Sequence, residues 1–234
     1  MDKRSISGMI KLGVTLAVFA AAACVMLAFV YTGTKKVIDE RQKADQEAAL
    51  KELFPDADSF EEIGEIKSPD AAVAIESAYV ALKNNAIIGA ALNLSRASYS
   101  GQIKTMVGVS ADGFITGVKI MEHSDTPGLG ANAASPSYFV DSEKHREIYE
   151  KVLMAAYPSD FVDSEKRITF YRQFTGKHIS HPFRVNHDVI AITASTITSH
   201  AVSASVKAAG LAAGAWLSGE EVEAVSGASE GGEW

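Results

Sequence analysis

The 234-residue sequence contains one cysteine, Cys24, and lacks several common signatures of enzymes. A single cysteine permits no internal disulfide and no cysteine metal site. No Walker-type loop and no dinucleotide-binding fingerprint occurs. The net charge is −7 at pH 7 and no stripe of basic residues is present, which argues against a general nucleic-acid binder. Function must therefore be carried by other, more local motifs.

Two further chemistries, metal binding and nucleophilic catalysis, find little support. His178, His181 and His187 lie close together, but their spacings match no common zinc pattern. In the pair Ser199-His200, adjacent helical side chains point about 100° apart, so they are poorly placed as nucleophile and base. No nucleophile elbow surrounds any serine. The sequence predicts neither a metal site nor a hydrolase site.

The N-terminal segment contains one long apolar run. Leu12 to Tyr31 is uncharged and long enough to span a bilayer as a helix. It is longer than a normal signal-peptide core, and it continues past Cys24, which argues against a cleaved lipoprotein. The run therefore predicts an uncleaved, single-pass membrane anchor. Basic residues lie on both sides of it, so their count does not decide its orientation.

Beyond the anchor, the pattern predicts a helix followed by a set of strands. Residues 35–54 are charged and alanine-rich, typical of a helix that ends near Pro55. Residues 56–70 are acidic and lack periodicity, so we expect a loop or an irregular edge. Turn signals then separate four strand candidates, at residues 78–82, 86–94, 101–110 and 114–122. Their succession predicts an antiparallel meander.

The second half of the chain mixes helix and strand signals. We expect an amphipathic helix over 141–157, a strand over 168–171, and a strand-like entry over 189–192 into a small-residue helix. The acidic segment 218–234 is predicted to be a disordered tail. The fold class is α+β, and the chain divides into an anchor (1–34), a linker helix and loop (35–71), an antiparallel-sheet domain with packed helices (72–217) and the tail.

A cluster of hydroxyl side chains precedes the last predicted helix, formed by Thr193, Ser195, Thr196, Thr198 and Ser199. The first turn of a helix has unpaired N–H groups and a positive dipole end, where a phosphate gains about 0.3–2 kcal/mol. The same hydroxyls can instead serve as an ordinary helix N-cap. Five hydroxyls exceed what one cap needs, so both interpretations stay open on local physics.

Three motifs carry a resemblance to a known family. Its central hairpin resembles Tyr99-Ser100-Gly101-Gln102-Ile103 followed by residues 107–122. Its E-H-x-E-T-P-G-L-G loop resembles residues 122–130, with Asp125 where Glu is usual. Its flavinylation motif, usually I-[ST]-G-A-T-x-T-S, resembles residues 192–199, with Ala194 and Ser195 in place of Gly and Ala. Up to about Leu217 the chain is similar to the G subunit of Rnf-type membrane electron-transport complexes, whose relative is the C subunit of the sodium-pumping NADH:quinone reductase.

This resemblance implies an FMN-binding domain with covalently bound FMN. Thr196 would carry the flavin through a phosphoester that a flavin transferase makes from FAD. The implied surroundings of the phosphate are Thr193, Ala194, Ser195, Thr198 and Ser199, with Lys177 as a further partner, and the implied flavin wall is Thr126, Gly128, Leu129 and Gly130. An alanine at position 194 restricts the backbone if that position needs φ > 0.

The resemblance also implies a cellular role. The chain is expected to be an electron-transfer subunit of an ion-translocating ferredoxin:NAD oxidoreductase, with no turnover alone. Its flavin domain would lie on the extracytoplasmic side of the cytoplasmic membrane, among other membrane subunits. Two alternatives stay open: an FMN-carrying subunit of a sodium-pumping NADH:quinone reductase, and a membrane-anchored binding domain without flavin.

Overall fold

The computed structural model describes residues 3–140 and 168–219. The helix predicted over 141–157 and the tail from 220 onward lie outside the described residues. The chain divides between Glu47 and Ala48 into two compact units.

Helix α1 (Lys3–Leu53) runs without a break through the predicted anchor and the predicted linker helix. It ends just before Pro55, as the sequence predicts. The two predicted helices are one because no proline separates them and most residues from Lys35 to Leu53 are good helix formers, so the helix continues through the weaker formers Thr32, Gly33 and Thr34. Large apolar side chains of the run, such as Leu16, Leu27 and Phe29, are exposed. The helix is long and apolar enough to cross a membrane.

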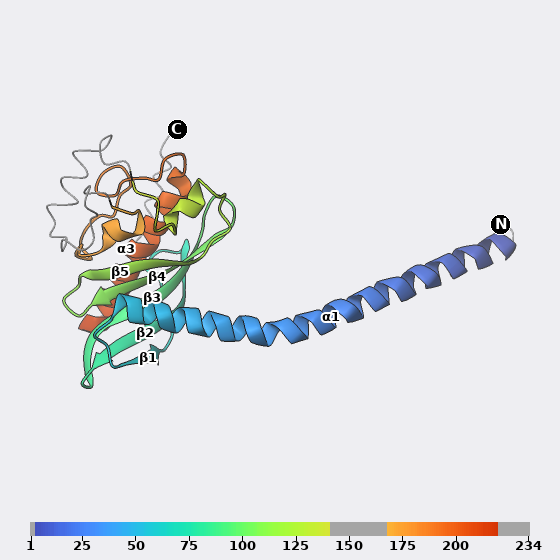
Figure 1. Cartoon of the computed structure of the whole chain (residues 1–234), viewed down its shortest axis with the longest axis horizontal. Helices are drawn as coiled ribbons and strands as arrows, with labels where there is room; N and C mark the ends of the chain where they lie inside the picture. Colours follow the sequence, from blue (N-terminus) through green and yellow to red (C-terminus); the bar gives the residue numbers. More distant parts are fainter. Residues whose placement is uncertain (1–2, 141–167, 220–234) are drawn as a thin grey trace. The chain divides into compact units, whose positions relative to one another are not determined.

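The second unit is built on a five-stranded antiparallel sheet in which each strand pairs with the next along the chain (Figure 1). The strands are β1 (Ser59–Ile63), β2 (Val73–Lys83), β3 (Ala86–Ala97), β4 (Gln102–Ser110) and β5 (Ile115–Glu122). The predicted meander is therefore confirmed. Asn84 and Asn85 have φ of 51° and 62°, as a tight two-residue hairpin turn requires. The additional edge strand β1 lies in the acidic stretch expected to be a loop or an irregular edge.

The two faces of the sheet carry different partners. Helix α3 (Thr196–Ser218) packs on β3 and β4 and shares a large core with Leu92 and Val107. The alternate residues Ala91 and Met106 belong to a second core on the opposite face. Against them pack the last turn of α1 and the residue after it, through Ala49, Leu50, Leu53 and Phe54.

Three glycines make room for this helix end. Gly89, Gly108 and Gly117 lie on β3, β4 and β5, and Gly108 pairs directly with Gly117. A Cβ at Gly89 would lie 2.6 Å from the Phe54 ring, and one at Gly117 would lie 2.8 Å from Leu53 Cδ2. The absence of side chains here lets the end of α1 lie close to the sheet.

Two predicted strands do not form. Around residues 168–171, the bridge between Phe139 and Thr169 is the only strand pairing made with other described residues, and the chain then turns into the 3-10 helix η3 (Tyr171–Phe174). At Ile190 the backbone N–H and C=O both bond to the side-chain amide of Gln173, at 2.7 and 3.0 Å. A glutamine side chain thus supplies the partners that a neighbouring strand would have supplied. The β-branched residues of both segments are buried, as their pattern predicts, but the continuous strand pairing that the pattern also predicts is absent among the described residues.

Candidate functional site

The loop after β5 and the start of α3 face each other across a cleft of about 420 Å³. This volume lies within the range of about 300–1,000 Å³ common for cofactor sites. Seven of the residues predicted from the sequence line it: Thr126, Leu129, Gly130, Ala194, Ser195, Thr196 and Thr198. Three further lining residues, Tyr99, Asp125 and Ile197, had no predicted site role. Loop and helix start, separate in sequence, are therefore brought together.

A buried carboxylate ties the walls of the cleft together. Asp125 is 6% exposed. Its Oδ2 accepts hydrogen bonds from Ser98 Oγ at 2.6 Å and from Thr198 Oγ1 at 2.8 Å. Its Oδ1 accepts from the Ser100 N–H at 3.0 Å. One side chain thus joins the end of β3, the loop after β5 and the first turn of α3.

These donors also decide the charge of Asp125. Burial opposes ionisation, but the hydrogen bonds from Ser98, the Ser100 N–H and Thr198 outweigh it, with a smaller contribution from His123. The pKa of Asp125 therefore lies below its ordinary value, and the group is ionised at neutral pH. Since its oxygens are occupied by protein donors, the carboxylate is structural, not a reactive acid.

The two glycines of the loop, Gly128 and Gly130, are required for different physical reasons. Gly128 has open space around it, so a side chain would not clash there, but its φ of +80° is a conformation that favours glycine. A Cβ at Gly130 would lie 2.6 Å from Thr198 Oγ1 and 2.7 Å from Asp125 Oδ2. Gly130 is therefore needed for the close approach of the loop to the carboxylate network.

The hydroxyls at the start of α3 have separate tasks. Ser195 is the N-cap residue, but its side chain makes no capping hydrogen bond. Ser199 is fully buried, donates to the Ser195 carbonyl and accepts from the Ile192 N–H, each at 2.9 Å. Thr196 is exposed on the cleft, and no partner for its hydroxyl is found within the described residues. The simple N-cap interpretation therefore does not account for the cluster.

Ala194 lies in the left-handed region, with φ of +59°. The resemblance places a glycine at this position, and the structure shows why: the turn into α3 needs positive φ. For an L-residue this region costs about 1–2 kcal/mol. Ala194 nevertheless adopts it, so the substitution introduces strain while the turn keeps its shape.

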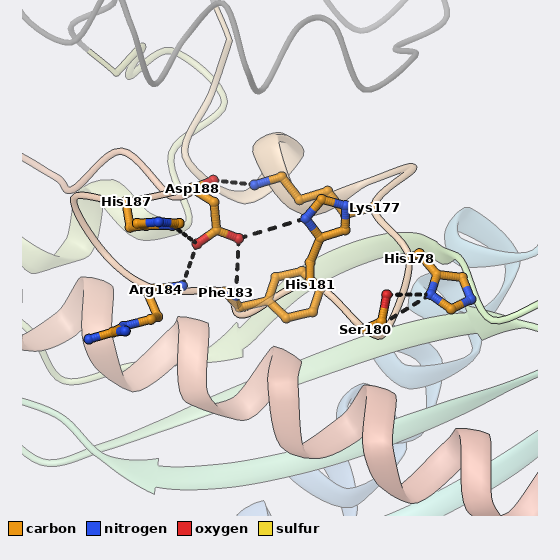
Figure 2. A network of polar contacts seen from close by, with 8 residues as sticks. All are labelled: Lys177, His178, Ser180, His181, Phe183, Arg184, His187 and Asp188. Carbon is orange, nitrogen blue, oxygen red and sulfur yellow. Dashed lines mark hydrogen bonds and ion pairs between the residues drawn. The ribbon is translucent and has the colours of Figure 1, made fainter.

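Four predicted residues do not line the cleft: Thr193, Ser199, Gly128 and Lys177. Thr193 is exposed, and its backbone N–H donates to Tyr138 Oη at 3.1 Å. Lys177 is 2% exposed and its ammonium donates to the main-chain oxygen of Asp188 (Figure 2). Burial lowers the pKa of Lys177 to about 8, although the charge of Asp188 opposes this.

Asp188 organises the loop around Lys177. Its carboxylate accepts hydrogen bonds from the N–H groups of Phe183 and Arg184. His181 and His187 lie on either side of it, with Nδ1 at 4.0 and 3.8 Å from its oxygens. His178 instead turns to Ser180, at 2.8 Å (Figure 2). Within residues 3–140 and 168–219, no three His, Cys, Asp or Glu side chains are arranged to hold a metal ion.

Two family models match the sequence. The FMN-binding domain matches residues 98–211, and the RnfG N-terminal region matches residues 1–53. The chain is 32% identical over 136 residues to the G subunit of the ion-translocating oxidoreductase complex of Methanosarcina acetivorans. The alignment covers 56% of this chain and 72% of that protein. The chain belongs to the family of G subunits of ion-translocating oxidoreductase complexes.

Other members of this family extend the similarity. The G subunit of the Na⁺-translocating ferredoxin:NAD⁺ oxidoreductase complex of Acetobacterium woodii is 28% identical over 217 residues, covering 84% of this chain and 87% of that protein. The G subunit of the proton-translocating ferredoxin:NAD⁺ oxidoreductase complex of Clostridium ljungdahlii is 31% identical over 137 residues, covering 58% and 68%. Membership of the family therefore leaves the ion open.

The cleft fits FMN in its chemistry. The FMN-binding match spans both of its walls, from Ser98 to the middle of α3. A helix start without a side-chain cap suits a phosphate. Exposed apolar side chains of Tyr99, Leu129 and Ile197 suit a flat aromatic ring. Polar and apolar requirements of the cofactor thus meet in one place.

Proposed function

We propose that this protein is the FMN-carrying electron-transfer subunit of a membrane-bound ion-translocating ferredoxin:NAD oxidoreductase. The observation that carries the proposal is the exposed Thr196 hydroxyl at the start of α3, inside a cleft that the FMN-binding match spans. When bound, FMN accepts and gives up single electrons, which is the chemistry of a relay. The subunit would have no turnover of its own.

We further propose that Thr196 holds FMN covalently. Thr196 Oγ1 would form a bond to the FMN phosphorus of FAD while the bond between the two phosphates of FAD breaks. AMP leaves, and the hydroxyl proton passes to water. A flavin transferase would supply FAD and the catalytic groups for this step. The dipole of α3 and its unpaired N–H groups would stabilise the attached phosphate.

The chain's own residues have distinct supporting roles in this proposal. Asp125 fixes the loop against α3 through Thr198, so that both walls keep their spacing. Leu129 offers an apolar wall to the ring, and Gly130 lets that wall come close. Neither Thr193 nor Ser199 lines the cleft. The Ser199 hydroxyl holds the turn before the helix through the Ile192 N–H and the Ser195 carbonyl, whereas Thr193 bonds to Tyr138 through its main-chain N–H, which an alanine keeps. Lys177 does not line the cleft and instead holds the main chain at Asp188.

The membrane arrangement is part of the proposal. The apolar part of α1 would anchor the chain in the cytoplasmic membrane, with the flavin domain on the extracytoplasmic side. A covalent bond would prevent loss of FMN where it could not be replaced. An impermeant maleimide should label Asp112→Cys, in the exposed β4–β5 turn, in intact cells of a Cys24→Ser background. Labelling only after the cells are opened would contradict this orientation.

The deciding experiment is in-gel flavin fluorescence of the denatured full chain, made together with a flavin transferase. We expect a fluorescent wild-type band that disappears in Thr196→Ala and persists in Thr196→Ser. Thr193→Ala is the matched control, because it removes an exposed hydroxyl three positions earlier and should stay fluorescent. A dark wild-type band, or a fluorescent Thr196→Ala band, contradicts covalent attachment. Co-purification of the other membrane subunits tests the assignment to the complex.

A further inference from the structure

In the described part of the second unit, the large apolar side chains that are exposed are concentrated at the cleft. Tyr99, Ile197 and Leu129 are 73%, 44% and 41% exposed, and all three line it. Within the described part of this unit, the other large apolar side chains that are exposed are Ile87 and Phe114, and neither lines the cleft. Water-facing apolar area is unfavourable unless it serves binding, so its gathering here points to a bound apolar group.

Tyr99 is exposed in its side chain but fixed in its backbone. The residue before it, Ser98, donates to Asp125 Oδ2, and the residue after it, Ser100, donates its N–H to Asp125 Oδ1. The Ser98 N–H also donates to the Gly101 carbonyl at 2.6 Å, which closes a tight turn around Tyr99. Both neighbours are therefore held by one buried carboxylate. Because the turn is already fixed, binding of a ligand to the exposed ring costs little backbone freedom.

The same carboxylate sets the relation between Tyr99 and the proposed attachment point. Asp125 also accepts from Thr198, which lies two residues after Thr196 in the first turn of α3. The Asp125 carboxylate thus holds the segments of both Tyr99 and Thr196, which lie on two walls of one cleft. A ligand tied to the helix start has its other end within the space that Tyr99 borders.

We propose that Tyr99 stacks on the isoalloxazine ring of FMN, with Leu129 and Ile197 beside it. This inference rests on the proposed function and assigns a ring-positioning residue to the same site. Offset stacking is favoured between aromatic rings, and a phenol presents both an apolar face and a polar tip. The apolar neighbours exclude water from the ring's edge, whereas the attachment point holds only the phosphate.

Flavin fluorescence of the native full chain tests the proposal. A phenol in contact with an excited flavin quenches it by reversible electron transfer, and an indole does the same. A phenylalanine ring, which is harder to oxidise, does not. We expect native wild type to be dim and to brighten several-fold on denaturation. Tyr99→Phe should be several-fold brighter than wild type in the native state, and Tyr99→Trp should remain dim.

Tyr138→Phe is the matched control, because it removes another phenol that bonds next to the attachment site, at the Thr193 N–H. It should leave native fluorescence unchanged. If Tyr99→Phe is as dim as wild type, or if Tyr138→Phe alone brightens, the role of Tyr99 is contradicted. The exposure of Tyr99 makes misfolding an inadequate explanation for either result. The denatured band of each variant reports attachment separately, so a dark wild-type band contradicts the proposed function itself and this inference with it.

Discussion

The Thr198 hydroxyl donates a hydrogen bond of 2.8 Å to the Asp125 carboxylate, which joins α3 to the loop after β5 across 73 positions of sequence. Both side chains are buried. The acceptor oxygen is shared with Ser98, so three separate segments converge on one charge. The geometry of the cleft depends on this convergence, since neither wall is part of a regular sheet at that point.

Asp125→Asn should lower the free energy of unfolding by about 1–3 kcal/mol at pH 7, because the charge-assisted hydrogen bonds weaken and one acceptor becomes a donor. Urea unfolding, followed by the fluorescence of Trp216 on α3, measures this. Asp112→Asn is the control, since its carboxylate lies exposed in the β4–β5 turn, and it should change stability by less than about 0.5 kcal/mol. Equal effects of the two substitutions would refute a structural role for Asp125.

The stability difference between wild type and Asp125→Asn should depend on pH. The pKa of Asp125 is lower in the folded state than the value of about 3.9 in an unfolded chain. Its stabilisation is therefore complete above about pH 4 and is lost as the pH falls through the folded-state pKa. The stability difference between wild type and Asp125→Asn should be constant from pH 7 to 5 and shrink below pH 4. A difference that grows with acid would contradict the low pKa.

Ala194→Gly should stabilise the protein by up to about 1 kcal/mol. Relief of the left-handed conformation is worth about 1–2 kcal/mol, and the greater freedom of glycine in the unfolded chain offsets about 0.5–1 kcal/mol. The control is Ala204→Gly inside α3, which should destabilise by about 1 kcal/mol. Unfolding midpoints of both variants distinguish the two signs. In-gel fluorescence of Ala194→Gly should be at least as strong as that of wild type.

Local patterns in the sequence were sufficient to predict the meander and its turns. Period-two alternation and turn residues such as Asn84-Asn85 act over a few positions, so the strands β2 to β5 could be predicted. Edge strand β1 was less evident, because it is mostly exposed and is set by its register with β2. The strand expected at Ile190 failed because its partner is a single side chain, Gln173.

In the candidate site, too, residues in contiguous motifs could be predicted, whereas contacts between distant segments could not. Thr196 and the 126–130 loop stand in contiguous motifs and could be predicted from the resemblance. The Asp125 network was not, because Ser98 and Thr198 are 100 positions apart and no local spacing joins them. In the sequence, Asp125 stands out only as a departure from the family's glutamate. Tyr99 was visible in a motif, but its exposure on a fixed turn is a property of the folded chain.

Buried Lys177 should give the protein a rising stability at alkaline pH. Its folded-state pKa of about 8 lies below the value of about 10.4 in an unfolded chain, so the unfolded state binds more protons between these values. The free energy of unfolding therefore rises across that window. Lys177→Met should flatten the rise, whereas Lys207→Met, an exposed lysine on α3, should keep it. Urea unfolding at pH 7.5, 8.5 and 9.5, spanning the window between the two pKa values, measures the slope; unchanged slopes would exclude a depressed pKa.

Alanine substitutions of Gly89 and Gly117, which lie against the end of α1, should lower the free energy of unfolding by unequal amounts. A Cβ at Gly89 would collide with the main-chain oxygen of Val109 and with the Phe54 ring, and a backbone atom cannot move aside. A Cβ at Gly117 meets only Leu53 Cδ2, the flexible end of a side chain. Gly89→Ala should therefore cost about 1–3 kcal/mol or more, and Gly117→Ala clearly less.

A double-mutant cycle makes this prediction specific to the helix end. Leu53→Ala removes the one atom that opposes a Cβ at Gly117, so it should abolish the cost of Gly117→Ala. It should not rescue Gly89→Ala, because the obstruction there includes the sheet backbone. Urea unfolding of wild type, the three single variants and the two double variants gives the coupling energies. Additivity of Leu53→Ala with Gly117→Ala would mean that Leu53 does not lie against Gly117. Rescue of Gly89→Ala by Leu53→Ala would mean that the sheet backbone is not what obstructs a Cβ at Gly89.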